Sequence, residues 1–181
     1  MNATLFLIGI GKVIFGIVVG AAGIFSASRL LAWMMRRGDA DAELKRGNLA
    51  AAALEASALV SFGILVQHAV SATFSAMDLM YRGQPPAPPM LLRFAIYGLI
   101  HAGVSLLVGA GALAVGVWIF GRLTRGVDEL AEVRKGNVAP ALVLGAVMVV
   151  MALVTAPGLQ TALDGMLPLP TLDRDELVAP S

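Results

Sequence analysis

The sequence predicts an all-α integral membrane protein in which four transmembrane helices form two parallel repeats of a helical hairpin. Composition, four long apolar stretches and an internal repeat lead to this prediction. Of the 181 residues, 58% are hydrophobic and 14% are charged, and the mean hydropathy is +0.83. Soluble domains usually carry about 25% charged residues. These values exclude a soluble globular domain.

Four apolar stretches are long enough to cross a bilayer, because about 20 helical residues span a hydrocarbon core of roughly 30 Å. Membrane strands alternate polar and apolar residues and these stretches do not, so we expect helices. Lys12 interrupts the first stretch, which we therefore expect to be retained rather than cleaved as a signal peptide. We expect Pro157 and Gly158 to stop the last helix. The stretches cover residues 5–35, 48–77, 91–120 and 137–156.

The connections between the stretches predict the orientation, because short loops rich in Lys and Arg stay in the cytoplasm. The first and third connections hold most of the cations, and Trp33 and Trp118 lie near them. We therefore expect both termini outside, in the periplasm, with the Pro-rich loop 78–90 and the tail 159–181 on that outer face. The cations are Arg36, Arg37, Lys45 and Arg46 in the first connection and Arg122, Arg125, Arg134 and Lys135 in the third.

The chain also matches itself when it is shifted by 89 residues. ELKRGNLAAAAL at 43–54 then aligns with EVRKGNVAPALV at 132–143. Each unit contains two apolar stretches, so both units should enter the membrane in the same direction as parallel repeats. The predicted repeats are 4–77 and 91–158.

The shared segment predicts a bend at the start of the second helix of each repeat. A short charged helix should end at Gly47 or Gly136, where glycine adopts positive φ, and Asn48 or Asn137 should then cap the next helix. Pro140 would lie in the first turn, where its missing N–H is harmless. Glu43 and Glu132, with the neighbouring cations, favour a solvated bend at the headgroups; docking of a cytoplasmic partner is the alternative.

These residues carry a family resemblance. A basic residue followed by Gly-Asn-x-Ala, duplicated in a chain of four helices, resembles the YjfL-like bacterial inner-membrane family, known as domain of unknown function 350. The resemblance covers roughly residues 4–158. It implies a bacterial inner-membrane location and a duplicated two-helix module, and it brings no agreed activity or catalytic residues. Glu55 departs from the small or apolar residues usual in the family at that stretch, and the outer tail is longer than expected.

Small residues at four-residue spacing mark expected contact faces between helices. The same 89-residue shift relates two such stripes, so we expect them to join the first and third membrane helices near the pseudo-two-fold axis. They are Gly16, Gly20 and Gly23 in the first helix and Ser105, Gly109 and Ala112 in the third.

Several polar residues inside the apolar stretches form a candidate intramembrane site. Lys12 and His101 are repeat partners, and Tyr97 and His68 should lie near them at the outer side. Ionisable groups in a membrane span usually face a partner or a water-filled path, so one interpretation is a proton or anion site. In the other, Lys12 snorkels outward and the histidines bond headgroups or backbone.

Glu55 should lie some 10 Å inside the cytoplasmic cap and point away from the inward-facing residues of its helix. It needs a partner, because a charge at mid-membrane is costly. It could be protonated, reach Lys12, or meet a neighbouring protomer, and we favour a neutral or intersubunit Glu55.

The remaining counts exclude several function classes. A net charge of +1 argues against a nucleic-acid partner, and the absence of Cys with only two His removes the usual zinc ligands, so we expect no metal and no cofactor. No GxSxG or HExxH motif occurs, so we expect no catalytic residues and no enzyme. The leading hypothesis is an oligomeric scaffold module of the cell envelope, contacting the bilayer, other copies and a cytoplasmic or membrane protein. The alternative is a small ion or proton channel or transporter subunit.

Overall fold

The computed structural model describes residues 3–35, 40–80, 88–124 and 128–166. Over these ranges the chain forms helices and no strand. Four helices are long and apolar enough to cross a membrane, so the chain is a multi-pass membrane protein and the predicted all-α class is confirmed. The helices are α1 (Ala3–Met34), α2 (Ala40–Lys45), α3 (Leu49–Met80), α4 (Pro88–Leu123), α5 (Glu129–Arg134) and α6 (Val138–Gly165).

The prediction for the end of the last helix was wrong. We expected the helix to stop before Pro157, but α6 continues through it to Gly165. A proline inside a helix removes one hydrogen bond, whereas a helix end leaves four carbonyls without helical partners, which is costly in lipid. The added turns also bury Leu159 and Leu163, and Thr161 Oγ1 donates to Pro157 O at 3.0 Å. The predicted bounds of α1, α3 and α4 agree with the structure to within three residues.

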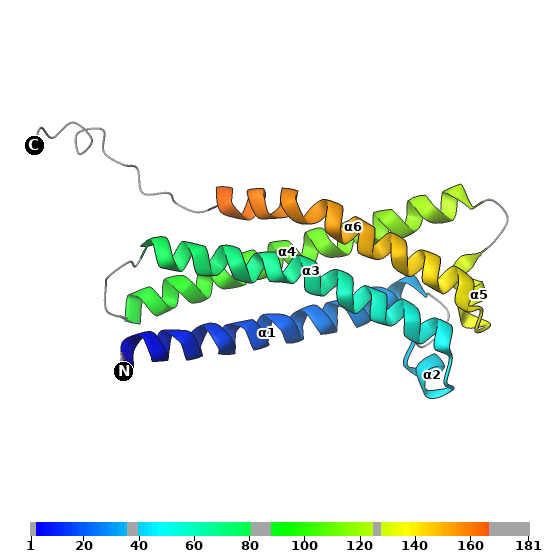
Figure 1. The fold of residues 1–181 in the computed structure, drawn as a ribbon, viewed down its shortest axis with the longest axis horizontal. Coiled ribbons are helices and arrows are strands. Elements are labelled where there is room, and N and C mark those ends of the chain that lie inside the picture. The colour runs from blue at the N-terminus through cyan, green and yellow to red at the C-terminus, as the bar shows by residue number, and fades with distance from the viewer. Residues whose placement is uncertain (1–2, 36–39, 81–87, 125–127, 167–181) are drawn as a thin grey trace, which may run out of the picture.

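The helices form an elongated bundle with the two short helices at the same end. Figure 1 shows α2 and α5 together at one end, and the start of α1, the ends of α3 and α6 and the start of α4 at the other. The Pro-rich segment 81–87 and the tail from residue 167 lie outside the described residues.

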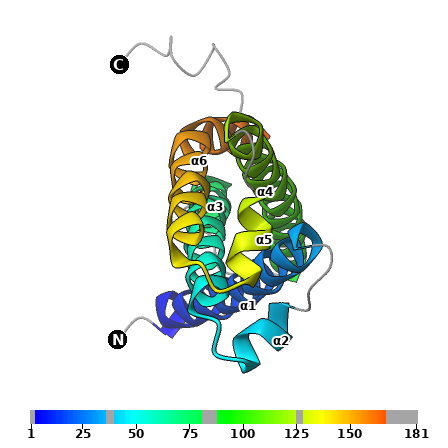
Figure 2. The same cartoon turned by 90° about the vertical axis from the view of Figure 1, so that its right-hand side faces the viewer.

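The central element of the bundle is α3. It contacts α1, α4 and α6, and also α2 and α5. In Figure 1 it runs between α1 and α6, and the end-on view of Figure 2 shows it with α6, α4 and α1 around it. Leu54, Phe62 and Leu65 of α3 are completely or almost completely buried. The packing of the bundle therefore depends mainly on the surface of this one helix.

Glycines allow close helix contacts where α3, α4 and α6 meet. A Cβ at Gly145 of α6 would lie 2.3 Å from Ser57 Oγ of α3. A Cβ at Gly116 of α4 would lie 2.5 Å from Met151 Cγ of α6. Such contacts suit helix packing in lipid, where association depends on close van der Waals contact.

Candidate functional site

The bend before each long second helix has the predicted geometry. We call α2 with residues 46–48 the first elbow and α5 with residues 135–137 the second elbow. Gly47 and Gly136 have φ of 76° and 88°. In the first elbow, Gly47 N donates to Leu44 O at 2.9 Å and Asn48 N donates to Glu43 O at 3.0 Å. This pair of bonds is a Schellman motif, which needs positive φ at the glycine.

The second elbow contains the same two backbone bonds. Gly136 N donates to Val133 O at 2.9 Å, and Asn137 N donates to Glu132 O at 3.0 Å. Each asparagine then caps the following helix, since Asn48 Oδ1 accepts from Ala50 N at 3.0 Å and Asn137 Oδ1 accepts from Ala139 N at 3.2 Å. The predicted glycine bends and asparagine caps are therefore confirmed.

Each elbow also contains a glutamate, three residues before a cation, that bonds the capping asparagine. Arg46 Nη1 donates to Glu43 Oε1 at 3.0 Å, and Lys135 Nζ donates to Glu132 Oε1 at 2.7 Å. The hydrogen bond from Lys135 is the main reason why the pKa of Glu132 lies below its usual value, followed by the bond from Asn137. The hydrogen bonds of the folded second elbow thus favour the carboxylate form of Glu132.

The two elbows contact each other, and this contact is not symmetric. Asn48 Nδ2 donates to Glu43 Oε2 at 3.1 Å and also across to Val133 O at 3.0 Å and Arg134 O at 3.3 Å. Arg134 Nη1 in turn donates to Met35 O at the end of the first span, at 3.0 Å. Asn48 and Arg134 therefore link segments that are more than 80 residues apart in the chain.

The small-residue stripes of α1 and α4 both contact α3. A Cβ at Gly23 would lie 3.1 Å from Val66 Cγ2, and one at Gly109 would lie 3.0 Å from Leu65 Cδ1. Ser105 Oγ donates to Leu65 O at 2.8 Å. A Cβ at Gly16 or Gly20 would meet no atom within 4 Å, and Ala112 is partly buried. The helices α1 and α4 also meet, where Phe15 lies over Gly98.

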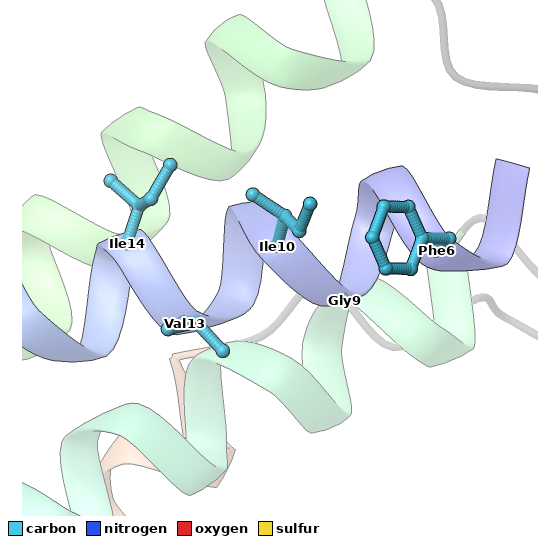
Figure 3. Close-up of a pocket in the computed structure, with 5 residues that line it drawn as sticks. All are labelled: Phe6, Gly9, Ile10, Val13 and Ile14. Carbon is cyan, nitrogen blue, oxygen red and sulfur yellow. The ribbon is translucent and has the colours of Figure 1, made fainter. Parts of the chain in front are cut away.

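Lys12 forms an ion pair that the sequence analysis did not predict. Its Nζ lies 2.8 Å from Asp78 Oδ1 at the end of α3, and 5.1 Å from the ring centroid of Phe74. Lys12 also lines a cavity of about 420 Å³, together with apolar side chains of α1, α3 and α4. A second hollow, of about 510 Å³, lies on the exposed face of α1 around Gly9 and is lined by apolar side chains (Figure 3). Of these two hollows, only the first is lined by a charged side chain.

The two histidines have different partners. His101 is completely buried, and its Nδ1 lies 3.1 Å from Thr73 Oγ1 of α3. Thr73 donates its only hydroxyl hydrogen to Ala69 O at 2.8 Å. In the contact between Thr73 and His101, His101 Nδ1 is therefore the donor and Thr73 Oγ1 the acceptor. Nε2 of His101 has no hydrogen-bond partner among the described residues. His68 Nδ1 lies 2.7 Å from Gln160 Oε1 of α6.

The structure places Tyr97 next to His101, with 6.4 Å between the ring centroids. Lys12 and His68 face Asp78 and Gln160 instead of this pair. Glu55 is partly buried, and its Oε1 accepts a hydrogen bond of 3.4 Å from Ser28 Oγ of α1. Four of the five candidate residues therefore have a hydrogen-bonding or ionic partner on another helix.

One family of proteins matches most of the chain. The family model described as Domain of Unknown Function (DUF350) matches residues 4–159, which is 159 − 4 + 1 = 156 of the 181 residues. The chain belongs to the DUF350 family. No curated protein and no solved structure matches it. The predicted membership of the DUF350 family, from about residue 4 to residue 158, is thus confirmed.

Sequence reasoning missed the partners that complete the polar pairs of this DUF350 protein. Asp78 and Gln160 lie beyond the predicted helix ends at 77 and 156, so no helical position was assigned to them. Ser28 and Thr73 lie inside the predicted helices, but pairing between helices depends on helix rotation, which spacing along one helix does not fix. Longer predicted helices would have brought Asp78 and Gln160 into consideration.

The arrangement can hold helices together more readily than it can bind a metal ion. Within the described ranges, no group of three His, Asp or Glu side chains is placed to hold one. Each polar pair that a candidate residue forms with another helix instead joins α3 to a neighbour: α1 through Asp78 and Glu55, α4 through Thr73, and α6 through His68.

Proposed function

We propose that this chain is a non-enzymatic scaffold module that assembles with further copies in the bacterial inner membrane. One observation carries the proposal: three ionisable side chains inside the spans are used in separate contacts between α3 and its neighbours. Lys12, His68 and His101 each have their own partner. Polar side chains that bond one another across helices stabilise a bundle, and these three pairs have no residue in common.

The proposal includes a topology. We infer that the two hairpins are parallel copies of one unit and that both elbows lie in the cytoplasm, with the termini in the periplasm. Two features support this inference. The elbows contain equivalent hydrogen bonds, and they lie at one end of the bundle together with exposed cations such as Arg46 and Lys135. Short basic segments of this kind remain on the cytoplasmic side.

Assembly with further copies is supported by small residues that no described side chain covers. A Cβ at Gly16 or Gly20 of α1 or at Gly63 of α3 would meet no atom within 4 Å. In the most apolar 18-residue window of α1 only 11% of residues are buried, against 44% in α3. Surface glycines in membrane helices favour close approach of another helix.

The test is the number of copies per particle in a bilayer. The full chain, labelled with one fluorophore and reconstituted at low density, should bleach in more than one step. Single-step bleaching in nearly all particles, with efficient labelling shown on a tandem fusion of two copies, would contradict the scaffold proposal.

One observation favours the alternative, a small ion or proton channel or transporter subunit. His101 Nε2 is buried and unpaired within the described residues, so it is available to a proton or a polar ligand. Proteoliposomes containing wild type, Lys12→Ala or His101→Ala should be compared across a panel of ions and a pH gradient. Flux that either substitution abolishes would favour transport over scaffolding, and the same low background in all three would favour the scaffold.

A further inference from the structure

The charged residues of α1 and α3 lie at two levels that match the boundaries of a bilayer. At one level Lys12 pairs with the exposed Asp78. At the other, Arg29 is exposed beside Ser28, which bonds Glu55. Lys12 and Arg29 are 17 residues apart (29 − 12), or about 26 Å along a helix. On α3 the same two levels are 23 residues apart (78 − 55), or about 35 Å, so the two separations lie on either side of the roughly 30 Å of the hydrocarbon core.

Gln67 of α3 lies midway between these two levels. It is 12 residues from Glu55 and 11 from Asp78, or about 18 Å and about 17 Å along the helix. Its side chain is exposed, and no hydrogen bond joins its amide to another described residue. A carboxamide in hydrocarbon without a partner is costly, because lipid chains offer no donor or acceptor.

The neighbouring spans present apolar side chains at this depth. Gly23 of α1 faces Val66, and the adjacent Ile24 is 61% exposed. Gly109 of α4 faces Leu65, and the nearby Leu107 is 76% exposed. The exposed surfaces of α1 and α4 thus suit lipid, and Gln67 does not. Figure 1 shows α3 running between α1 and α6.

We propose that α3 of a second copy covers this face, and that the two Gln67 carboxamides hydrogen-bond to each other; this inference rests on the proposed assembly into oligomers. A carboxamide both donates and accepts, so the same residue of another copy satisfies it. Copies inserted in one orientation, and related by a two-fold axis along the membrane normal, bring Gln67 to the same depth.

The residues one turn before and after Gln67 permit this contact. Gly63 and Ser71 lie four residues on either side of it, hence on the same face of α3, and both are exposed. A Cβ at Gly63 would meet no atom within 4 Å. Small residues at this spacing, serine included, let two membrane helices approach closely enough for a side-chain hydrogen bond between them.

Single cysteines test the position of the contact, since the chain has no cysteine of its own. In membranes treated with a mild oxidant, Gly63→Cys and Ser71→Cys should form disulfide-linked dimers while Gln67 stays in place. Gly111→Cys is the matched control, because Gly111 is an exposed glycine of α4 whose Cβ would also meet nothing within 4 Å. The inference would be overturned if Gly111→Cys cross-linked as strongly as Gly63→Cys and Ser71→Cys. It would also be overturned if neither α3 variant cross-linked.

A substitution at Gln67 tests the hydrogen bond. Gln67→Leu should weaken association about tenfold, as expected for loss of polar contacts between membrane helices. Gln67→Asn, which keeps the carboxamide, should recover most of it. Equal association of wild type and Gln67→Leu would contradict the inference. A wild type that is oligomeric without contact through α3 contradicts this inference alone, whereas a monomeric wild type contradicts the proposed function as well.

Discussion

The glutamates of the elbows bond both a cation and the residue that caps the next helix. In the second elbow, Glu132 accepts from Lys135 Nζ and from Asn137 Nδ2, and its backbone carbonyl accepts from Asn137 N. Glu132 thereby helps to end α5 and orients Asn137, which caps α6. Because Glu132 lies outside the spans, its charge responds to the pH of the surrounding water.

Acid should weaken the second elbow. The pKa of Glu132 is lowered in the folded state, chiefly by the hydrogen bond from Lys135. A lowered pKa means that Glu132 stabilises the fold above the usual pKa of a glutamate, and that this contribution is lost as the pH falls through the folded-state pKa. An NMR titration of the Glu132 carboxyl carbon in micelles should show a midpoint below that of a glutamate without such partners.

The control for this titration is Lys135→Met, which removes the hydrogen bond that is the main cause of the shift. Its Glu132 midpoint should move up towards the ordinary glutamate value. A midpoint that stays the same in Lys135→Met would show that the lysine does not lower the pKa of Glu132.

At the scale of helices, packing of α3 on α6 depends on the absence of a side chain at Gly145. Ser57 Oγ, which donates to Ala53 O at 2.9 Å, occupies the space that a Cβ at Gly145 would need. Ser57 Cβ would also lie only 2.9 Å from the Cβ added at Gly145, so a rotation of the serine side chain would not remove the clash. The two helices would have to separate.

Gly145→Ala should therefore lower the free energy of unfolding by about 1–3 kcal/mol, the usual cost of overpacking. Gly158→Ala on the same helix is the control, since its Cβ meets nothing within 4 Å and alanine is the better helix former. Unfolding by denaturant in mild detergent measures both. Combining Ser57→Gly with Gly145→Ala should restore much of the loss, and a double variant no more stable than Gly145→Ala would contradict a Ser57 clash.

The elements differ in how far sequence could predict them, and the difference follows the range of the interactions. Gly47 and Asn48 were predictable because a Schellman motif and a cap involve residues a few positions apart. The continuation of α6 past Pro157 was not, since it is favoured by burial of Leu159 and Leu163 in the assembled bundle. The contact of His101 with Thr73 depends on how α4 is rotated against α3, and the apolar pattern of either helix leaves that open.

At the scale of the whole molecule, two locally similar elbows have different roles. Both have the same backbone bonds and caps. Among the described residues, only the capping asparagine of the first elbow also bonds the other elbow. Asn48 Nδ2 donates to Val133 O and Arg134 O. With Arg134 bonded to Met35 O, these contacts join the first hairpin to the second at the basic end of the bundle.

This asymmetry predicts unequal effects of one substitution at the two caps. Asn48→Ser and Asn137→Ser both keep a good capping oxygen and lose the amide donor. Asn48→Ser should cost about 1 kcal/mol more, because Val133 O and Arg134 O lose a donor between the elbows, whereas Asn137→Ser loses only the bond to the partly exposed side chain of Glu132. Unfolding of the full chain in mild detergent measures the difference. Asn48→Ala and Asn137→Ala, which also remove the caps, should each lower the free energy of unfolding further than the serine variant at the same site. The loss should again be larger at Asn48 than at Asn137. Equal losses for Asn48→Ser and Asn137→Ser would mean that the hairpins are held together by packing of α3 on α4 and α6, without a contribution from the contact between the elbows.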